Sequence, residues 1–232
     1  MNTLGMFARR PVPGQTKTRL AATIGNESAA TLYAAFVEDL IARCSSLAER
    51  FVVAATPNDK PTSDWFLARL PCAEQLIFQP EGNLGDRIKC FFESAIQNDD
   101  DKVVLIGSDS PDIPSTIIES AFAELATNDV VISPACDGGF VLIGLSVQPQ
   151  TLFRNIPWSE STTLCRTLEA CSALGFSVKQ LPLWYDIDTA ENLGTLVAMQ
   201  RTGHESAGFT PNTVAVLESM DWLSMQARSV SE

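Results

Sequence analysis

Residues 103–114 are Val103-Val-Leu-Ile-Gly-Ser-Asp109-Ser-Pro-Asp112-Ile-Pro114, an apolar run that ends in a small residue and then presents two aspartates bracketed by prolines. The pattern predicts a buried strand that delivers Asp109 to a cleft, because ligands of open α/β sheets bind beyond the carboxyl ends of the strands. A carboxylate placed there can hold Mg²⁺ or Mn²⁺ against the phosphates of a substrate. Turn chemistry offers another interpretation, in which Asp109 and Asp112 only form Asx-turns and cap the helix that Pro114 opens.

The composition limits the class of protein. A chain of 232 residues suits one α/β domain, with a core large enough to place helices on both faces of a sheet. The hydrophobic fraction of 45% and the aromatic fraction of 8% exclude a disordered chain. A net charge of −12 argues against nucleic acid as a partner, although a few cations and a metal ion can still bind an anionic nucleotide.

The cysteines and the histidine limit which cellular compartment and which kinds of catalytic or metal site are expected. The six cysteines are scattered without a C-x-x-C pair, which is typical of a reduced, cytoplasmic protein. The single histidine, His204, is expected in a loop and argues against a histidine-based zinc site or a Ser-His-Asp triad. No apolar run approaches the ~20 residues of a membrane span, so no span is predicted.

Short apolar runs alternate with helical periodicity along the chain, which is typical of a mostly parallel sheet with helices on both faces. We expect strands at residues 3–8, 51–55, 75–78, 103–106, 130–133 and 140–145, and helices at residues 26–47, 64–70, 85–97, 115–126 and 159–174. The last two strands are joined by Asp137-Gly-Gly, a tight turn that leaves no room for a helix. One strand should therefore run antiparallel to its neighbours.

Helix-start signals predict the rest of the organisation. Ser159 can cap a helix that runs to Leu174, and Asp188-Thr-Ala-Glu191 forms a capping box at the start of another. We assign residues 1–200 to one domain and residues 201–232 to a linker and a last helix. That helix is expected to pack on the domain or on a partner subunit of a homodimer through an apolar side that carries Val216, Met220 and Leu223.

The loop after the first strand combines stiff prolines, a glycine and positive charge. It reads Arg-Arg-Pro-Val-Pro-Gly-Gln-Thr-Lys-Thr-Arg over residues 9–19, so four of the sixteen basic residues fall within eleven positions. Gly14 allows close approach, and Lys17 and Arg19 flank a threonine, which suits a phosphate cradle. The loop lacks the patterns of a P-loop and of a dinucleotide fold, and a solvated basic loop is the alternative interpretation.

Other polar segments also follow expected strands. The loop at residues 79–87 opens a helix with two glycines and has Arg87 in the first turn, which hints at an anion nearby. Asp186 and Asp188 project from the same side of an extended segment, so they form a second pair able to share a cation, unless Asp188 only caps a helix. Aromatic residues near these acids can stack on a sugar or base or can belong to the core, namely Trp158, Trp184 and Tyr185.

As an ordered set, these motifs resemble a bacterial glycosyltransferase family. The set consists of P-x-P-G-x-x-K-T-R-L, G-N-L-G-x-R, L-I-G-S-D-x-P, D-G-G-F-x-L-I-G-L, W-S and D-I-D-T-x-E-N-L, and it extends from Gly5 to about Leu196. The chain is similar to the family labelled radical-SAM/selenodomain-associated transferase 1, or arsenosugar biosynthesis glycosyltransferase. This resemblance implies the GT-A fold of the nucleotide-diphospho-sugar transferase superfamily, which also contains guanylyltransferase-like and cytidylyltransferase enzymes.

The resemblance also implies roles for particular residues. Asp109 and Asp188 would bind a divalent cation, Mg²⁺ or Mn²⁺, and Asp109, Lys17 and Arg19 would act in catalysis. The residues expected to contact the nucleotide are Phe7, Gly14, Lys17, Arg19, Asn83, Leu84, Gly85, Arg87 and Ser108. Those expected on the acceptor side are Asp137, Gly138, Gly139, Trp158 and Asp186.

This chain departs from the usual pattern of that family at two positions. Phe140 stands where the family generally has Tyr, which removes a hydroxyl that could bond an acceptor. Asn192 replaces a common acid in the closing motif. Neither change touches the two aspartates expected to bind the metal.

Together these features predict a metal-dependent glycosyltransferase with a nucleotide-diphosphate-sugar donor and a small-molecule acceptor. The cation would neutralise the diphosphate leaving group, with help from Lys17 and Arg19. A nucleotidyltransferase that acts on a nucleoside triphosphate and a sugar phosphate fits the same residues, and the sequence does not separate the two reactions. A non-catalytic nucleotide-sugar-binding protein is a third interpretation, which the presence of both aspartates disfavours.

Overall fold

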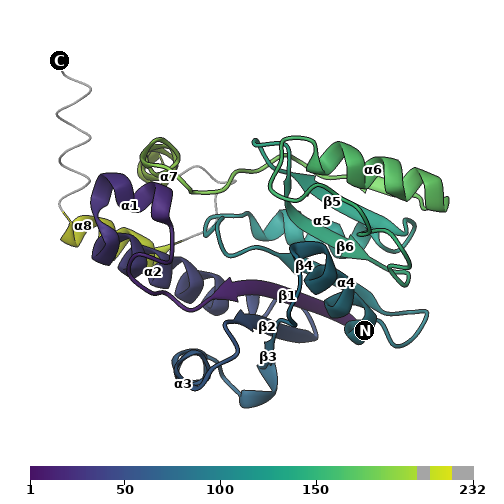
Figure 1. The fold of residues 1–232 in the computed structure, drawn as a ribbon, viewed down its shortest axis with the longest axis horizontal. Coiled ribbons are helices and arrows are strands. Elements are labelled where there is room, and N and C mark those ends of the chain that lie inside the picture. The colour runs from purple at the N-terminus through teal and green to yellow at the C-terminus, as the bar shows by residue number, and fades with distance from the viewer. Residues whose placement is uncertain (203–209, 221–232) are drawn as a thin grey trace.

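The computed structural model describes residues 1–202 and 210–220 and is built on a seven-stranded sheet with the order β3-β2-β1-β4-β6-β5-β7 (Figure 1). The strands are β1 (Asn2–Arg9), β2 (Arg50–Thr56), β3 (Leu76–Phe78), β4 (Lys102–Ile106), β5 (Val130–Pro134), β6 (Phe140–Leu145) and β7 (Val178–Gln180). The apolar run at residues 103–106 belongs to β4. Because β4 is the middle strand, the aspartates that follow it emerge at the centre of the sheet.

The pairing directions confirm a mostly parallel sheet with one antiparallel strand. β1 is parallel to β2 and β4, β2 is parallel to β3, and β5 is parallel to β7. β6 is antiparallel to both β4 and β5, because the turn between β5 and β6 is too short for a helical crossover. The strand order reverses between β1 and β4, which is the place where doubly wound sheets bind ligands.

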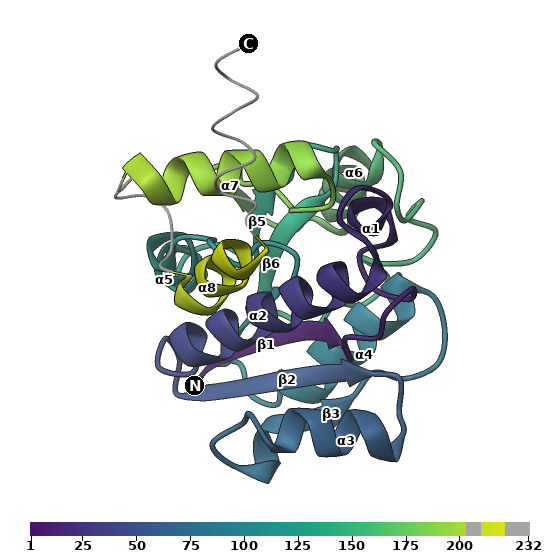
Figure 2. The same cartoon turned by 90° about the vertical axis from the view of Figure 1, so that its left-hand side faces the viewer.

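Helices cover both faces of the sheet, as expected (Figures 1 and 2). They are α1 (Thr18–Ile24), α2 (Asn26–Cys44), α3 (Lys60–Leu67), α4 (Leu84–Ala95), α5 (Ser115–Glu124), α6 (Thr163–Leu174), α7 (Ala190–Thr202) and α8 (Pro211–Ser219), with a short 3₁₀ helix η1 (Ala73–Gln75) before β3. One core joins α2, α3, α5, α7 and α8 to one face, and a second joins α4 and α6 to the other. Along β4, Val104 and Ile106 face the first core and Val103 and Leu105 the second, which explains the continuous apolar run.

Two helices start four residues away from the predicted position. The helix expected from Ser159 begins at Thr163, because Ser159 has a left-handed φ of 63° and does not cap it. The helix expected at residues 64–70 starts earlier, at Lys60, directly after the N-cap residue Asp59. The other expected strands and helices are present.

The capping box expected from Asp188 to Glu191 was assigned one residue too early. Thr189 and Asn192 form it instead: Thr189 N donates to Asn192 Oδ1 at 3.1 Å, and Asn192 N donates to Thr189 Oγ1 at 3.3 Å. Asn192, which replaces a common acid of the resembling family, therefore has a structural role at the start of α7. The carboxylate of Asp188 takes no part in this capping box.

The helix α8 packs against α2. The buried carboxylate of Asp39 in α2 accepts hydrogen bonds of 2.7–3.0 Å from the backbone and side chains of Asn212 and Thr213. Val216 and Met220 lie against the first core. The start of α8 is thus held by one buried acid, and its apolar side completes the core.

Some expectations about the C-terminal part lie outside the described residues. These are the loop position of His204 and the packing of Leu223. α7 extends to Thr202, past the boundary at residue 200 that the sequence suggests. Within residues 1–202 and 210–220, no helix has both the length and the apolar character needed to span a bilayer.

Candidate functional site

Lys17 ends the loop after β1 and points back into the protein. It is the N-cap residue of α1 with a left-handed φ of 51°, and the loop before it turns at Gly14, which has a φ of 75°. The Lys17 side chain is only 4% exposed, and its ammonium lies 6.0 Å from the ring centres of Tyr33 and Phe36. A buried ammonium needs opposite charge nearby, so the partners of Lys17 define the site.

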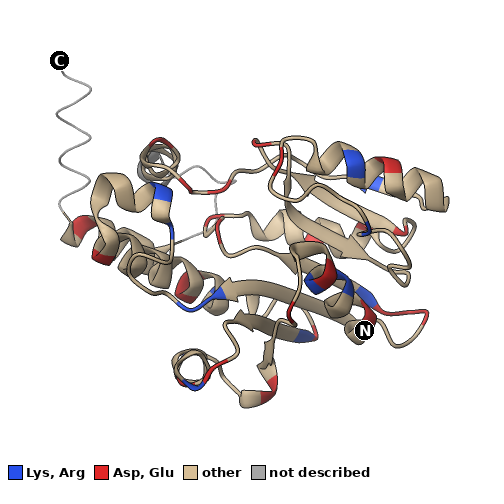
Figure 3. Ribbon diagram, in the orientation of Figure 1, with Lys and Arg blue, Asp and Glu red and all other residues tan. Residues whose placement is uncertain are grey.

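Two aspartates from distant parts of the chain supply that charge. Asp109 follows β4 and its Oδ1 lies 2.6 Å from Lys17 Nζ, while Asp188 precedes α7 and its Oδ1 lies 2.9 Å from the same nitrogen. Both oxygens contact the same ammonium, so they lie at most about 5.5 Å apart, the sum of these two distances. Arg19 Nη1 lies 3.7 Å from the other oxygen of Asp188. Figure 3 shows the acidic segments after β4 and before α7 facing the basic start of α1.

A third carboxylate, that of Asp186, lies beside this pair. Ser110 Oγ donates a hydrogen bond to Asp186 Oδ1 at 2.7 Å. Burial raises the pKa of Asp186 to about 6, and the negative charges of Asp109 and Asp188 act in the same direction. Burial alone would lower the pKa of Lys17, but its two aspartate partners raise it above the usual value. Three carboxylates thus surround one buried ammonium, an excess of negative charge that a further cation would balance.

Tyr33 lies beneath this cluster, and the sequence analysis did not identify it. Its hydroxyl oxygen lies 2.6 Å from Ser108 Oγ and accepts a hydrogen bond from Arg9 N at 3.1 Å. Burial raises the pKa of Tyr33 to about 12, so the phenol is neutral at ordinary pH. These bonds tie α2 to the ends of β1 and β4. A tyrosine within the apolar stripe of the helix at 26–47 is the signal that could have revealed it, because a buried hydroxyl needs a polar partner.

Three pockets open around the cluster and differ in chemistry. The loop pocket, of 300 Å³, is lined by Arg9, residues 15–19, Tyr33, Asp109 and Asp188. The apolar pocket, of 240 Å³, is lined mainly by β1, α4, β4 and β6, including Phe7, Leu84, Ile88 and Phe140, together with Ser108, Asp109 and Asp186. The polar pocket, of 330 Å³, includes Arg19, Asp137, Tyr185, Asp186, Asp188 and Asn192.

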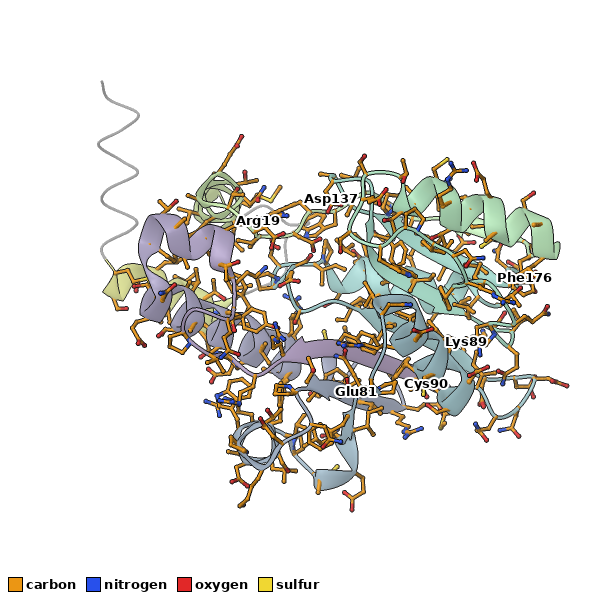
Figure 4. The ribbon with its side chains drawn as sticks, viewed as in Figure 1. Arg19, Glu81, Lys89, Cys90, Asp137 and Phe176 are labelled. Carbon is orange, nitrogen blue, oxygen red and sulfur yellow. The ribbon has the colours of Figure 1, made fainter. Side chains whose placement is uncertain are left out.

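The three aspartates join these pockets into one continuous site. Asp109 lines both the loop pocket and the apolar pocket, and Asp188 lines both the loop pocket and the polar pocket. Asp186 lines the apolar and the polar pocket. Arg19 and Asp137, both labelled in Figure 4, come to the polar pocket from α1 and from the turn after β5. A ligand at the aspartates can therefore extend in three directions.

The segment expected to contact the base and ribose forms the start of α4. Asn83 caps the helix through a capping box with Asp86, and the side chain of Arg87 turns back to donate to Gly82 O at 3.1 Å. Gly85 lies so close to Trp158 that a Cβ atom would be 2.6 Å from the indole nitrogen. Among the expected residues of this segment, Leu84 is the one that lines the apolar pocket.

The residues expected on the acceptor side separate into two groups. Asp137 and Asp186 line the polar pocket. Gly138 packs so tightly on the chain at Ser161 that a Cβ would lie 2.1 Å from its carbonyl oxygen, and the neighbouring Gly139 accommodates the turn by donating its N–H to Asp137 Oδ1. Trp158 packs edge-on against Phe140, with ring centres 6.2 Å apart, and so supports the wall of the apolar pocket.

Comparisons with known proteins place the chain in a family. Residues 40–160 match a family described as an uncharacterized protein conserved in bacteria, DUF2064. The crystal structure of a "putative nucleotide-diphospho-sugar transferase" from Desulfovibrio desulfuricans G20 is 33% identical in sequence, with 97% of each chain covered and a TM-score of 0.86. None of the curated proteins gives a significant match.

Two more distant structures share the fold. A nucleotidyl transferase from Methanothermobacter is 11% identical, with a TM-score of 0.58 over 87% of this chain and 99% of that chain. A CMP:2-keto-3-deoxy-manno-octonic acid synthetase complexed with CTP is 10% identical, with a TM-score of 0.52 over 87% of this chain and 99% of that chain. The chain belongs to the DUF2064 family, and its fold is that of the nucleotide-diphospho-sugar transferases.

Proposed function

We propose that this protein is a glycosyltransferase that uses a nucleotide-diphosphate-sugar, a divalent cation and a small hydroxylated acceptor. The observation that carries the proposal is the convergence of Lys17, Asp109 and Asp188 at the point where three chemically different pockets meet. The name of the Desulfovibrio relative supports the same class of donor. Each pocket matches one part of such a reaction.

The loop pocket suits the diphosphate of the donor. Arg9, Lys17 and Arg19 bring positive charge to its lining. Arg19 is 79% exposed and can turn toward a ligand, whereas Lys17 is held by its aspartates, so that an incoming phosphate would share the ammonium with them. In transfer, these cations would stabilise the negative charge that develops on the leaving diphosphate.

Asp109 and Asp188 would hold the divalent cation. Their side chains are 47% and 41% exposed and both line the loop pocket, where phosphate oxygens would lie. Mg²⁺ is commonly held by one or two carboxylates together with substrate phosphates and water. Within the part of the chain that the structure describes, no cluster of three or more His, Cys, Asp or Glu side chains is arranged to hold a metal. A bound cation would supply charge neutralisation at the diphosphate.

The apolar pocket suits the nucleoside. Phe7 and Phe140 offer aromatic surface, and Leu84, which is 42% exposed, forms another wall. The hydroxyl of Ser108, held by Tyr33, offers a hydrogen bond to a ribose or base oxygen. Because the apolar pocket meets the loop pocket at Asp109, a base in one and a diphosphate in the other can belong to one molecule.

The polar pocket suits an acceptor that carries hydroxyl groups. Asp137, Asp186 and Asn192 provide hydrogen-bonding groups for them. The lining contains three carboxylates and a single basic residue, Arg19, so it disfavours a sugar phosphate, which is the kind of acceptor that a nucleotidyltransferase would need. This charge balance favours glycosyl transfer over nucleotidyl transfer.

The test is to incubate the purified protein with a panel of nucleotide-sugars and Mg²⁺ or Mn²⁺ without an acceptor. We expect slow release of free sugar and nucleoside diphosphate, because the activated bond is positioned beside water. Asp109→Asn should abolish this release. If the protein instead releases pyrophosphate from a nucleoside triphosphate and a sugar phosphate, and leaves every nucleotide-sugar intact, the reaction is nucleotidyl transfer.

A further inference from the structure

Asp112 is a buried carboxylate that the proposed reaction does not use. It is 0% exposed and lies in the turn after β4, close in sequence to Asp109. Its side chain does not cap α5, which begins after Pro114 without a side-chain cap. Both of its oxygens instead accept hydrogen bonds from aromatic side chains: Trp184 Nε1 donates to Oδ1 at 3.3 Å, and the Tyr185 hydroxyl donates to Oδ2.

These two donors directly precede the segment that carries Asp188. Two further bonds continue the connection, because Ser110 Oγ donates to Asp186 Oδ1 at 2.7 Å and Ile187 N donates to Asp109 O at 2.8 Å. The turn at residues 109–112 and the segment at residues 184–188 therefore form a seam of hydrogen bonds. The buried Asp112 lies at one end of this seam, and the pair Asp109 and Asp188 lies at the other.

The Asp112 side of the seam is anchored to the rest of the fold. Arg43 Nη2, from α2, donates to Pro111 O at 2.8 Å and to Ile113 O at 2.9 Å, on either side of Asp112. The segment at 184–188 has no regular helix or strand and joins the sheet at an isolated bridge between Ala135 and Trp184. Its position therefore depends on side-chain bonds more than on a backbone ladder.

We propose that Asp112 is a positioning residue, which holds Trp184 and Tyr185 so that Asp188 stays beside Asp109 at the proposed cation site. The inference rests on the proposed cation site and adds that its affinity depends on a carboxylate that does not touch the cation. Mutation of a group that orients a metal ligand typically lowers metal affinity by roughly 10–100-fold. The rings of Trp184 and Tyr185 stack with their centres 5.3 Å apart, so the two side chains should be held in place together.

The test measures Mn²⁺ binding to the full chain without nucleotide, from the electron paramagnetic resonance signal of free Mn²⁺. Tyr185→Phe removes one hydroxyl and should weaken Mn²⁺ binding about tenfold, the lower range for outer-shell partners. Asp112→Asn should weaken it by a similar factor. The double variant should bind about as well as either single variant, because both changes disrupt the same hydrogen bond.

Asp39→Asn is the matched control. Asp39 is also a buried aspartate with hydrogen bonds to both of its oxygens, but it holds α8 on α2. This variant should unfold at a lower temperature and keep the wild-type affinity for Mn²⁺. As a second measurement, Tyr185→Phe should accelerate hydrogen exchange of the Ile187 amide, which bonds Asp109 O, and Asp39→Asn should not do so selectively.

The outcomes separate this inference from the proposed function. If Asp109→Asn abolishes Mn²⁺ binding but Tyr185→Phe and Asp112→Asn bind like the wild type, the positioning role is wrong and the cation site stands. If the wild type binds no Mn²⁺ without nucleotide, the positioning role is wrong, and if Asp109→Asn binds Mn²⁺ as the wild type does, the cation site is wrong as well. An equal loss in Asp39→Asn would attribute the effect to general destabilisation and would also overturn the inference.

Discussion

The loops that follow β1 and β3 look alike in sequence and have different roles in the structure. Each contains a glycine with positive φ and leads to a helix with a basic residue near its start, Gly14 with Lys17 in one and Gly82 with Arg87 in the other. Lys17 points toward Asp109 and Asp188, whereas Arg87 turns back to its own loop and donates to Gly82 O.

The difference arises from the strands beside each loop. β1 is paired with β4 at the centre of the sheet, so the loop after β1 meets the aspartate that follows β4. β3 is an edge strand, and the acid close to its loop, Asp86, is engaged in the capping box with Asn83. A glycine followed by a basic residue therefore becomes part of a ligand site where the topology brings a second loop beside it.

The largest difference between the two loops should appear when Lys17 and Arg87 are replaced in turn. Lys17→Ala should weaken the binding of a nucleoside diphosphate by about 1.5–3 kcal/mol, the range for a hydrogen bond to a charged group, whereas Arg87→Ala should leave it nearly unchanged. Isothermal titration with a panel of nucleoside diphosphates and Mg²⁺ measures both. Equal losses in the two variants would show that the loops share one role.

The two glycines should differ in the property that they control. Gly82→Ala should lower the free energy of unfolding by up to about 3 kcal/mol, because Gly82 has a φ of 121° and a Cβ there would lie 2.9 Å from Asp86 Oδ2. A Cβ at Gly14 would make only ordinary contact with the Asn26 side chain, at 3.8 Å, so Gly14→Ala should cost about 1 kcal/mol through its φ alone, while distorting the loop that presents Lys17. Urea unfolding and diphosphate titration of both variants check this. Weaker diphosphate binding in Gly82→Ala alone would reverse the assignment.

A smaller effect is expected at the support beneath Lys17. Tyr33→Phe removes the hydroxyl that connects Arg9 N to Ser108 and should lower the free energy of unfolding by about 1 kcal/mol. It should weaken diphosphate binding less than Lys17→Ala does, because Tyr33 supports the site from below. Ser108→Ala is the matched control, since it removes the other partner of the same bond. Unchanged stability in both variants would mean that this bond contributes nothing to the fold.

The acidic residues around Lys17 should also produce a modest pH dependence of the free energy of unfolding in the metal-free protein. Burial raises the pKa of Asp186 from 3.8 to about 6, so the folded state holds this proton more tightly than the unfolded chain does. The stabilising effect of the proton is complete below pH ~4 and is lost as the pH rises through about 6. Asp186→Asn, which can still accept from Ser110, should remove this part of the pH dependence. Urea unfolding with EDTA between about pH 4 and 7 measures it, and an identical profile in the variant would contradict it.

Much of the fold could be predicted from the sequence, because strands and turns have local sequence signals. The apolar run before Asp109 and the short turn at Asp137 to Gly139 predicted a buried strand and an antiparallel one, both of which the structure confirms. The start of α6 was wrong because the left-handed φ of Ser159 depends on how the chain packs around it.

The site could be predicted from the sequence only in part, because some of its contacts join residues that are far apart in the chain. Asp109 and Lys17 lie in loops that follow expected strands of one mostly parallel sheet, so a common site at its carboxyl edge could be predicted. Tyr33 bonds Ser108 and Asp112 bonds Trp184, each more than 70 residues away, so a local pattern can suggest a buried polar group but cannot identify its partner. The contact between Arg87 and the nucleotide stays a prediction: its local signal is weak taken alone, and in the structure its side chain donates to Gly82 O within its own loop.

The most direct test of the account is the affinity of a nucleoside diphosphate for the wild type and for Asp109→Asn, each with Mg²⁺ and with EDTA. If Asp109 holds a cation against the phosphates, the wild type should bind more weakly in EDTA, and Asp109→Asn should bind about equally weakly in both conditions. Arg87→Ala, measured in parallel, should keep the metal dependence of the wild type. A loss in Asp109→Asn that is the same with Mg²⁺ and with EDTA would contradict the central claim, because the aspartate would then be structural.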